Sequence, residues 1–336
     1  MSRAYDNAAD GRYQQGGRRN LIINGGFDVW QRGTSGTSGY VADRWTTGNV
    51  NGTTTAISQQ SFTIGQTDVP GEPQYYHRTV VTSASASNSL SIFEQRVEDV
   101  RTGAGQEVTI SFYAKADSSK NISLEMIHNF GSGGSSDVNT LGVQKFSLTS
   151  SWQKFTKTVT LPSISGKTIG SGSYLACNFW MDAGSSFNSR TDSLGNQSGT
   201  FDIALMQLEL GNIATPFEHR SYGEELALCQ RYYQIIGQTS AAVGTRWSAN
   251  KIFLTFPLST ALRAQPAIPT ANTFQAQLYD SSESDSTATP SGILDFQTNG
   301  TSINIGMDTD GGNPTARKLY FVYHNLSTPC PLDSEL

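Results

Sequence analysis

The order of apolar and polar residues along the chain predicts a succession of short β-strands. In EVTISFYAKA, at positions 107–116, apolar and polar residues alternate, as they do in a strand with one buried face. Further strand-like runs, separated by Gly- and Ser-rich turns, are predicted at 75–82, 89–97, 122–129, 151–160, 174–181 and 201–210. Short strands at this spacing predict an all-β fold with a jelly-roll β-sandwich.

Some of these runs allow two interpretations. In SWQKFTKTVT, Trp152 and Phe155 fall on opposite faces of the predicted strand, so its register is ambiguous. Glu94, Arg96 and Glu98 share one face of another strand. They form either a salt-bridged surface patch, which is the favoured alternative, or the polar wall of a cleft. An opening strand is expected at 21–23, with strand 201–210 beside it.

One helix is predicted between residues 221 and 233. Ser221 and Glu224 have the spacing of a capping box, which marks a helix start. Leu226, Cys229 and Tyr233 then recur at helical spacing and form an apolar face. That face has to pack on the first domain, on the second domain or on the same helix of a neighbouring subunit.

The 336 residues therefore divide into four predicted parts. Residues 1–19 form a polar N-terminal arm, and residues 20–217 form the jelly-roll sandwich. Residues 218–234 form a connecting helix, and residues 235–336 form a second, smaller antiparallel β domain. A domain of about a hundred residues with many polar turns has a thin core, so we expect oligomerisation to cover its edges.

Composition and charge exclude several classes of function. The formal net charge is −5, which argues against general nucleic-acid binding, and the nearest basic cluster is the pair Arg18 and Arg19. No apolar run is long enough to insert into a membrane. The polar N-terminus has no signal-peptide core, so synthesis in the cytoplasm is expected. Cys177, Cys229 and Cys330 make no disulfide framework or zinc motif.

No catalytic constellation stands out in the sequence. The four histidines lack the spacing of a metal pair, and no nucleophile or phosphate-binding motif is present. Glu224 and Glu225 are paired carboxylates, but they fall in the first turn of the predicted helix and complement its dipole. The sequence therefore predicts a protein that is not an enzyme.

Aromatic side chains are the candidate ligand-binding groups. An aromatic ring covers the C–H face of a sugar while polar groups bond the hydroxyls at its edge. Trp30, Tyr75, Tyr76 and Trp180 are the candidate glycan-binding residues. The alternative for Trp30, as for Trp45, is that the ring anchors the core among its apolar neighbours.

Several motifs together resemble those of phage virion proteins. They are NLIINGGFDVWQRG, YVADRW, FEQRVEDV followed by VTISFYAKA, SWQKFTKTV, and MQLELG with NIATPFEHRSYGEELALCQRYYQ. Their order and spacing are similar to those in tail-fibre and related surface proteins whose first domain resembles carbohydrate-binding modules. The likeness covers roughly residues 20–234, and the rest only loosely resembles the variable β domain that often follows.

This resemblance implies a non-catalytic structural protein of a tail or head fibre, made in the host cytoplasm and located in the virion. On this basis we expect a homotrimer whose arm, with Arg18 and Arg19, docks to other virion proteins, and a sandwich that binds host-surface glycans. The alternative is a polysaccharide depolymerase or a carbohydrate-binding accessory module of a glycan-degrading enzyme.

The resemblance also implies where a structural calcium would lie, and no other cofactor is expected. Related sugar-binding modules often hold this ion between the opening strand and the last one, at positions matching Asp28 and Asp202. The final strand of those modules often carries paired acids, whereas Asp202 is followed by Ile203 and Ala204. Calcium needs six to eight oxygen ligands, so the alternative is that both carboxylates accept backbone hydrogen bonds.

Overall fold

The computed structural model describes residues 18–236, 241–248, 251–266, 277–279, 285–286, 290–298, 302–309, 319–323 and 330–336. Of the predicted arm, only Arg18 and Arg19 are among them. The chain divides into two compact units, one comprising Met1–Glu225 with Leu336 and the other comprising Leu226–Glu335. The division falls inside the segment 218–234.

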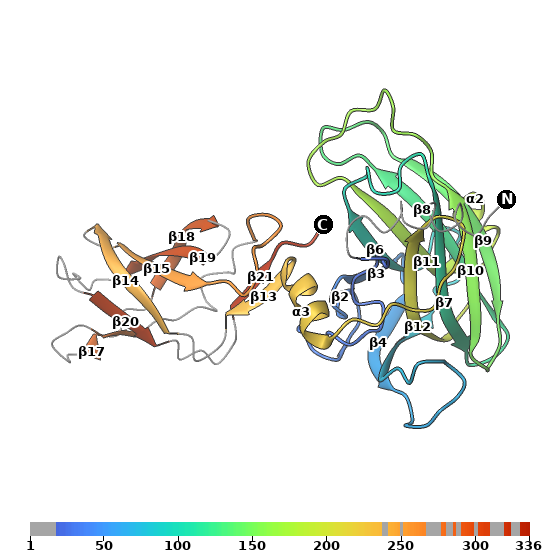
Figure 1. Cartoon of the computed structure of the whole chain (residues 1–336), viewed down its shortest axis with the longest axis horizontal. Coiled ribbons are helices and arrows are strands. Elements are labelled where there is room, and N and C mark those ends of the chain that lie inside the picture. The colour runs from blue at the N-terminus through green and yellow to red at the C-terminus, as the bar shows by residue number, and fades with distance from the viewer. Residues whose placement is uncertain are drawn as a thin grey trace, which may run out of the picture. The chain divides into compact units, whose positions relative to one another are not determined.

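The first unit is a sandwich of two six-stranded antiparallel sheets (Figure 1). Sheet A contains, in order, β1 (Ser35–Gly36), β4 (Thr54–Ser61), β5 (Tyr75–Thr82), β12 (Gly199–Leu210), β7 (Glu107–Ala116) and β10 (Gln153–Thr160). Sheet B contains β2 (Gly39–Tyr40), β3 (Trp45–Val50), β6 (Leu90–Glu98), β11 (Tyr174–Ala183), β8 (Lys120–Asn129) and β9 (Val138–Leu148). Because the chain crosses repeatedly between the sheets, this order is that of a jelly roll, and the predicted fold class is confirmed.

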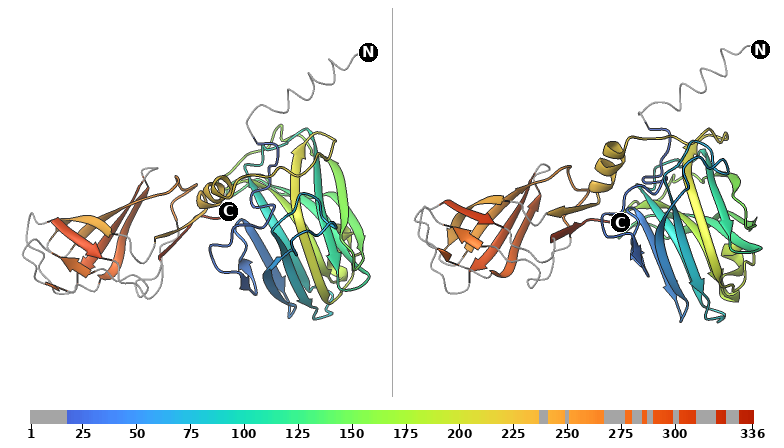
Figure 2. Two further views of the ribbon diagram at one scale, coloured as in Figure 1. Left: turned by 60° about the horizontal axis from the view of Figure 1, so that its bottom comes forward. Right: turned by 90° about the horizontal axis from the view of Figure 1, so that it is seen from below.

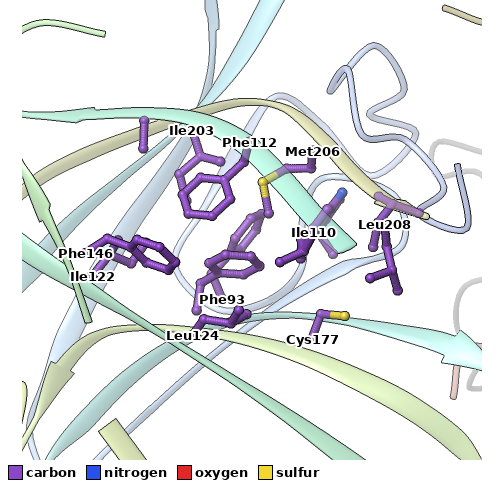
Figure 3. Packing of buried hydrophobic residues seen from close by; sticks show 14 of the residues in the cluster. Phe93, Ile110, Phe112, Ile122, Leu124, Phe146, Cys177, Ile203, Met206 and Leu208 are labelled. Carbon is purple, nitrogen blue, oxygen red and sulfur yellow. The ribbon is translucent and has the colours of Figure 1, made fainter. Parts of the chain in front are cut away.

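One apolar core fills the space between the two sheets. Alternate residues of each strand point inward, such as Ile110 and Phe112 from β7 and Leu124 from β8, and all three are fully buried. Figure 3 shows these side chains packed together with Met206 from sheet A and Phe93 from sheet B. The inner face of each sheet is therefore buried in the core, and the other face of each sheet points outward.

The structure also settles the register of β10. Phe155 packs against the core, whereas Trp152, just before the strand, lies in a separate cluster on the outer side of sheet A. The strands β4 and β9 have no counterpart among the predicted runs. The strands β5, β6, β7, β8, β10, β11 and β12 lie close to their predicted positions.

The predicted opening strand at 21–23 is wrong, although this segment does lie beside β12. Leu21 donates its backbone N–H to the carbonyl of Leu208 at 2.8 Å. The next two backbone donors bond to side chains instead of to a strand, with Ile22 bound to Asn20 Oδ1 at 3.0 Å and Ile23 to Gln95 Oε1 at 2.8 Å. These side-chain acceptors replace the ladder, so the segment is irregular although every donor is satisfied.

The close approach of the NGGF motif to β12 explains why a glycine stands at position 25. A Cβ atom on Gly25 would lie 2.1 Å from the carbonyl oxygen of Met206, and the Gly25 carbonyl accepts the Met206 N–H at 2.9 Å. At this point β12 has a bulge, and Leu205 has a φ of 48°. Only glycine allows the opening segment to approach this bulge so closely.

The predicted helix start is confirmed, but the helix ends at Gln230, three residues before the predicted end at 233. The backbone N–H of Ser221 donates to Glu224 Oε2 at 2.9 Å and Glu224 N–H donates to Ser221 Oγ at 3.3 Å, which completes the capping box. The helix α3 spans Tyr222–Gln230, and Tyr233 belongs to the strand β13 (Tyr233–Ile236). Cys229 and Tyr233 are buried within the single chain.

The second unit is also antiparallel β, as predicted (Figure 2). Its larger sheet contains, in order, β17 (Asp285–Ser286), β16 (Gln277–Tyr279), β20 (Leu319–Tyr323), β14 (Ala241–Ser248), β15 (Lys251–Pro257), β19 (Ser302–Thr309) and β18 (Pro290–Thr298). A separate ribbon pairs β13 with β21 (Cys330–Asp333). No helix in the described ranges is long and apolar enough to span a membrane.

Candidate functional site

The outer face of sheet A brings a row of charged side chains together. Arg78 on β5, Asp202 on β12 and Lys115 on β7 are cross-strand partners, with Asp202 opposite both cations. All three positions alternate with core residues, so their side chains point away from the sandwich interior. The register of these three strands, which are distant in sequence, therefore places the three charged side chains side by side. These three residues are called the charged row below.

Asp202 is the centre of the charged row. Its carboxylate accepts hydrogen bonds from Arg78 Nε at 2.7 Å and Arg78 Nη2 at 2.8 Å, which is a bidentate pair. Lys115 Nζ lies 3.7 Å from the second carboxylate oxygen, close enough for an ion pair. The Asp202 side chain is 4% exposed, whereas those of Arg78 and Lys115 are 32% and 27% exposed. The acid is thus buried beneath two cations that reach solvent.

Three aromatic rings pack together beside the charged row. The Phe62 ring lies 4.8 Å from the Tyr76 ring and 5.3 Å from the Trp152 ring, and Tyr76 meets Trp152 edge-on at 5.2 Å. All three rings are half-buried. The Lys115 ammonium lies 5.1 Å from the Trp152 ring centroid, within the range of a cation–π contact. These three rings are called the aromatic cluster below.

The aromatic cluster has a small apolar floor. Val69, Ala204 and Leu205 are buried, and the three rings pack against them together with Tyr113. The β12 bulge turns both Ala204 and Leu205 outward, which makes this floor. Val69 belongs to the loop between β4 and β5, and its N–H and carbonyl are both bonded by Gln66. The loop is therefore held against the same face as the rings.

The surroundings of Tyr76 and Arg78 keep both side chains protonated, so that both can donate hydrogen bonds. Burial raises the pKa of Tyr76, to which the Asp202 charge adds, so its phenol stays protonated at neutral pH. The hydrogen bond to Asp202 raises the pKa of Arg78, which stays cationic. Half-buried rings next to charged donors are suited to hold a sugar, since the rings pack on its C–H face and the donors bind its oxygens.

Of the four predicted glycan-binding residues, only Tyr76 lies in the aromatic cluster. Tyr75, its neighbour, is half-buried at the start of β5, and its hydroxyl accepts a hydrogen bond from Gln74 Nε2 at 3.0 Å. Trp30 packs against the core and donates its Nε1–H to the Phe27 carbonyl at 2.7 Å. Its ring also stacks at 6.0 Å on buried His77. These are the contacts of a core anchor, the alternative considered for Trp30.

The prediction that Trp180 contacts a glycan does not agree with its position. The residue has 0% exposure, because the short helical turns η1 (Ser185–Phe187) and α2 (Asn188–Thr191) cover it on the outer face of sheet B. Its Nε1–H donates to Glu125 Oε2 at 3.2 Å, and Arg190 lies over its ring at 4.9 Å. A sugar cannot reach a fully covered ring, so Trp180 is a structural residue.

Asp28 and Asp202 do not form the predicted calcium site. Both Asp202 oxygens accept hydrogen bonds from Arg78, and a cation there would compete with two existing positive charges. Asp28 has other surroundings, where burial and the Glu225 charge raise its pKa to about 6. In the part of the chain that the structure describes, no group of three His, Cys, Asp or Glu side chains is placed to hold a metal. The residues present do not fit this ion.

Arg18 and Arg19 are predicted to dock to other virion proteins. Both are exposed. The guanidinium of Arg19 donates to the Pro216 carbonyl at 2.6 Å and lies 3.2 Å from Glu209, whose side chain is buried. Arg19 is therefore bound to the sandwich itself. On sheet B, Glu94 and Arg96 form an ion pair, which agrees with the salt-bridge alternative for the residues Glu94, Arg96 and Glu98.

The sequence missed four residues of this face, namely Phe62, Arg78, Lys115 and Trp152. The signal for Trp152 was present, because its opposition to Phe155 places one of the two rings outward. Arg78 and Lys115 alternate with apolar residues in β5 and β7, which predicts outward cations on each strand. Their meeting at Asp202 depends on strand order, which the sequence does not contain.

No protein-family model matches the chain, and no curated protein matches it. Similar solved structures include the enzymatically active domain of tailspike protein 4 of bacteriophage CBA120, at 13% identity and a TM-score of 0.34. That match covers 57% of this chain and 21% of the tailspike chain, so the chain spans about a fifth of that protein's length.

Carbohydrate-binding modules are also among the similar structures. The family 11 module of Clostridium thermocellum, solved with a β-1,3-1,4-mixed-linked tetrasaccharide, has 16% identity and a TM-score of 0.32, covering 52% of this chain and 91% of its own. The CBM22-1 xylan-binding domain of Paenibacillus barcinonensis has 13% identity and a TM-score of 0.32, covering 58% and 96%. The jelly roll of this chain is assigned from its own strand order.

Proposed function

We propose that this protein is a non-catalytic glycan-binding protein whose ligand lies on the outer face of sheet A. The observation that carries the proposal is the aromatic cluster beside the charged row, where half-buried rings and solvent-reaching donors meet. Sugar rings present an apolar C–H face and a polar edge, and this surface offers a complementary group to each.

The three rings have different parts in this proposal. Trp152 supplies the largest flat surface and stands at the edge of sheet A next to β10. Tyr76 adds a hydroxyl beside Arg78, and Phe62 packs against both rings and holds them upright. The rings pack on a floor that includes the small residue Ala204, and they remain partly exposed to a ligand.

The setting that we propose for this binding is the surface of a bacteriophage virion. The sequence motifs support a structural protein of a tail or head fibre, in which the sandwich contacts host-surface glycans and residues 1–19 dock to other virion proteins. We propose that the chain is a homotrimer. Light scattering of the purified protein is then expected to give the mass of three 36.3 kDa chains, and a monomer would count against the fibre.

The same surface also suits a carbohydrate-binding accessory module of a glycan-degrading enzyme, and a depolymerase is the catalytic alternative. Incubation of the protein with the polysaccharides it binds distinguishes these from a purely binding protein. We expect no new reducing ends from the purified chain. Release of oligosaccharides would replace the non-catalytic proposal with the depolymerase.

Glycan binding itself is tested on an array with three proteins. Wild type is expected to bind, and Trp152→Ala is expected to lose affinity by about tenfold or more, because its ring is the main stacking surface. Tyr174→Ala is the matched control, since Tyr174 is a half-buried aromatic of sheet B that lies under Arg96 at 4.9 Å. Equal binding by wild type and Trp152→Ala would move the ligand away from this face.

A further inference from the structure

We propose that the sugar bound on the outer face of sheet A carries a carboxylate, as in a uronic acid, and that Arg78 and Lys115 bind this group. The inference rests on the proposed glycan binding at this face and specifies the class of ligand. It comes from the balance of charge in the charged row, from the donors that remain there and from their position beside the rings.

The charged row has an excess of positive charge. Two cations share the single carboxylate of Asp202. Lys154, the cross-strand partner of Tyr113, adds a third cation on the same outer face, and it is exposed. The chain as a whole has a formal charge of −5, so this face is opposite in sign to the average of the molecule. A fixed local excess of positive charge favours an anionic ligand.

The donors of the charged row are only partly used within the protein. Arg78 binds Asp202 through Nε and Nη2, and in the part of the chain that the structure describes its Nη1 has no hydrogen bond. Lys115 Nζ is 3.7 Å from Asp202, which is an ion pair longer than a hydrogen bond. An ammonium has three N–H donors and a guanidinium has five, so several remain for a ligand.

Asp202 is a positioning residue for these cations. It is buried, and its bidentate pair fixes the plane of the Arg78 guanidinium. Lys115 is held between Asp202 and the Trp152 ring. Both cations are therefore ordered before a ligand binds, which lowers the entropic cost of binding. A neutral sugar would leave the net positive charge of two cations over one carboxylate unbalanced, whereas a ligand carboxylate accepts from both cations.

The position of the rings places an acid group within reach. The Lys115 ammonium lies 5.1 Å from the Trp152 ring and 5.9 Å from the Tyr76 ring, and the Arg78 guanidinium lies 5.8 Å from Tyr76. A sugar ring packed on these aromatics has its edge substituents beside both cations. A carboxylate on the sugar edge would then be recognised at the same time as the C–H face.

The test uses an array of neutral glycans, uronic-acid glycans and the methyl esters of the same uronic-acid glycans. Esterification removes the charge and leaves the sugar and its linkage unchanged. We expect the acids to bind, and each methyl ester to bind about tenfold more weakly or worse, since charge-assisted hydrogen bonds are lost. Binding of the acids should also weaken as salt is raised.

Two variants assign the effect to the charged row. Lys115→Gln and Arg78→Gln are expected to reduce affinity for the acid to about that for its ester, with the residual binding still dependent on Trp152. Lys167→Gln removes the same charge from an exposed loop residue and is expected to change nothing. Thermal unfolding checks that each variant folds, and Lys115→Gln keeps the Arg78–Asp202 pair if Arg78 shows a folding defect.

The outcomes separate this inference from the proposed function. Esters bound as tightly as acids, or an unchanged preference for acids in Lys115→Gln, would overturn the acidic ligand. Neutral glycans bound through Trp152 without preference for acids would also overturn it, and would leave glycan binding in place. Absence of binding to every glycan on the array would overturn both.

Discussion

The two outer faces of the sandwich use the same residue types in opposite ways. On sheet A, Trp152 lies beside Lys115, which shares the carboxylate of Asp202 with its bidentate partner Arg78. On sheet B, Arg190 makes the equivalent bidentate pair with Glu125, at 2.8 and 2.7 Å, and lies over the Trp180 ring. An aromatic ring, a carboxylate and a guanidinium are therefore common to both faces.

The difference lies in what covers each group. On sheet B, η1 and α2 lie between β11 and β12 in sequence and place Phe187 against Trp180 at 5.3 Å, so that Trp180 and Glu125 have 0% exposure. Glu125 also accepts the Thr140 N–H at 3.0 Å. On sheet A, the rings and both cations remain partly exposed. The same residue types are fully buried where a seven-residue segment folds over them, and they remain partly exposed on sheet A, where we propose that they bind the ligand.

The largest effect should separate the two tryptophans. Trp180→Ala creates a cavity and leaves the Glu125 network incomplete, so we expect a loss of about 3–5 kcal/mol in the free energy of unfolding. Trp152→Ala should cost only about 1 kcal/mol, because its ring is half-exposed. Urea denaturation followed by tyrosine and tryptophan fluorescence measures both values. Similar losses in the two variants would show that both rings are structural.

The second effect concerns the two arginines. Arg190→Met leaves the buried charge of Glu125 without its cation, and we expect it to destabilise the first unit by about 3 kcal/mol. Arg78→Met should cost about 1 kcal/mol, because Asp202 keeps Lys115 and the lost pair was partly exposed. Urea denaturation of both variants at pH 7 gives the comparison. A larger loss for Arg78→Met would reverse the roles of the two faces.

The third effect is a pH dependence of stability that comes from the core residue His77 and not from either outer face. His77 is buried between the sheets, its ring stacks on Phe93 at 4.0 Å, and burial lowers its pKa to about 3. The neutral form is the folded one, so its contribution to stability is complete above the unfolded pKa of about 6.5 and is lost as the pH falls toward the folded value. From pH 7 to pH 5 we expect a loss of about 2 kcal/mol from this residue.

His77→Phe is the variant for this prediction, because it keeps a ring in the stack and removes the titration. Its stability between pH 7 and pH 5 should fall less than that of wild type. Thr79 Oγ1, which lies 2.7 Å from His77 Nε2, loses a partner, so the variant is compared with itself across pH. An identical pH slope in both proteins would exclude His77 as the source.

The strand periodicity predicted most of the sandwich, whereas exposure could not be predicted. Alternation in β7 is local, so the inward and outward residues follow from the sequence. The sequence predicts Trp180 as a ligand-binding residue, because nothing in its own strand shows that residues 185–191 fold over it. The covering segment is a tertiary feature, and only the structure tells Trp152 and Trp180 apart.

Long-range partners limited the rest of the prediction. Arg78 and Asp202 are 124 positions apart, and their bidentate pair requires β5 to lie beside β12 in one register. The opening segment failed as a strand for the same reason, since Gln95 and Glu225 supply its acceptors from 72 and 201 positions away. Patterns within a strand fix the face of a residue, while the partners on that face come from the fold.

The smallest expected effect tests the hydroxyl of Tyr76. Its oxygen lies 3.4 Å from Arg78 Nη2, so the internal hydrogen bond is weak and the hydroxyl stays available to a sugar. Tyr76→Phe keeps the ring in contact with Phe62 and Trp152, and we expect glycan affinity to fall by about threefold, the effect of one neutral hydrogen bond. Titration calorimetry with the best ligand of the array measures this change. Tyr174→Phe, the same change on sheet B, should leave affinity unaltered, and an equal loss in both variants would mean that the two faces do not differ in binding.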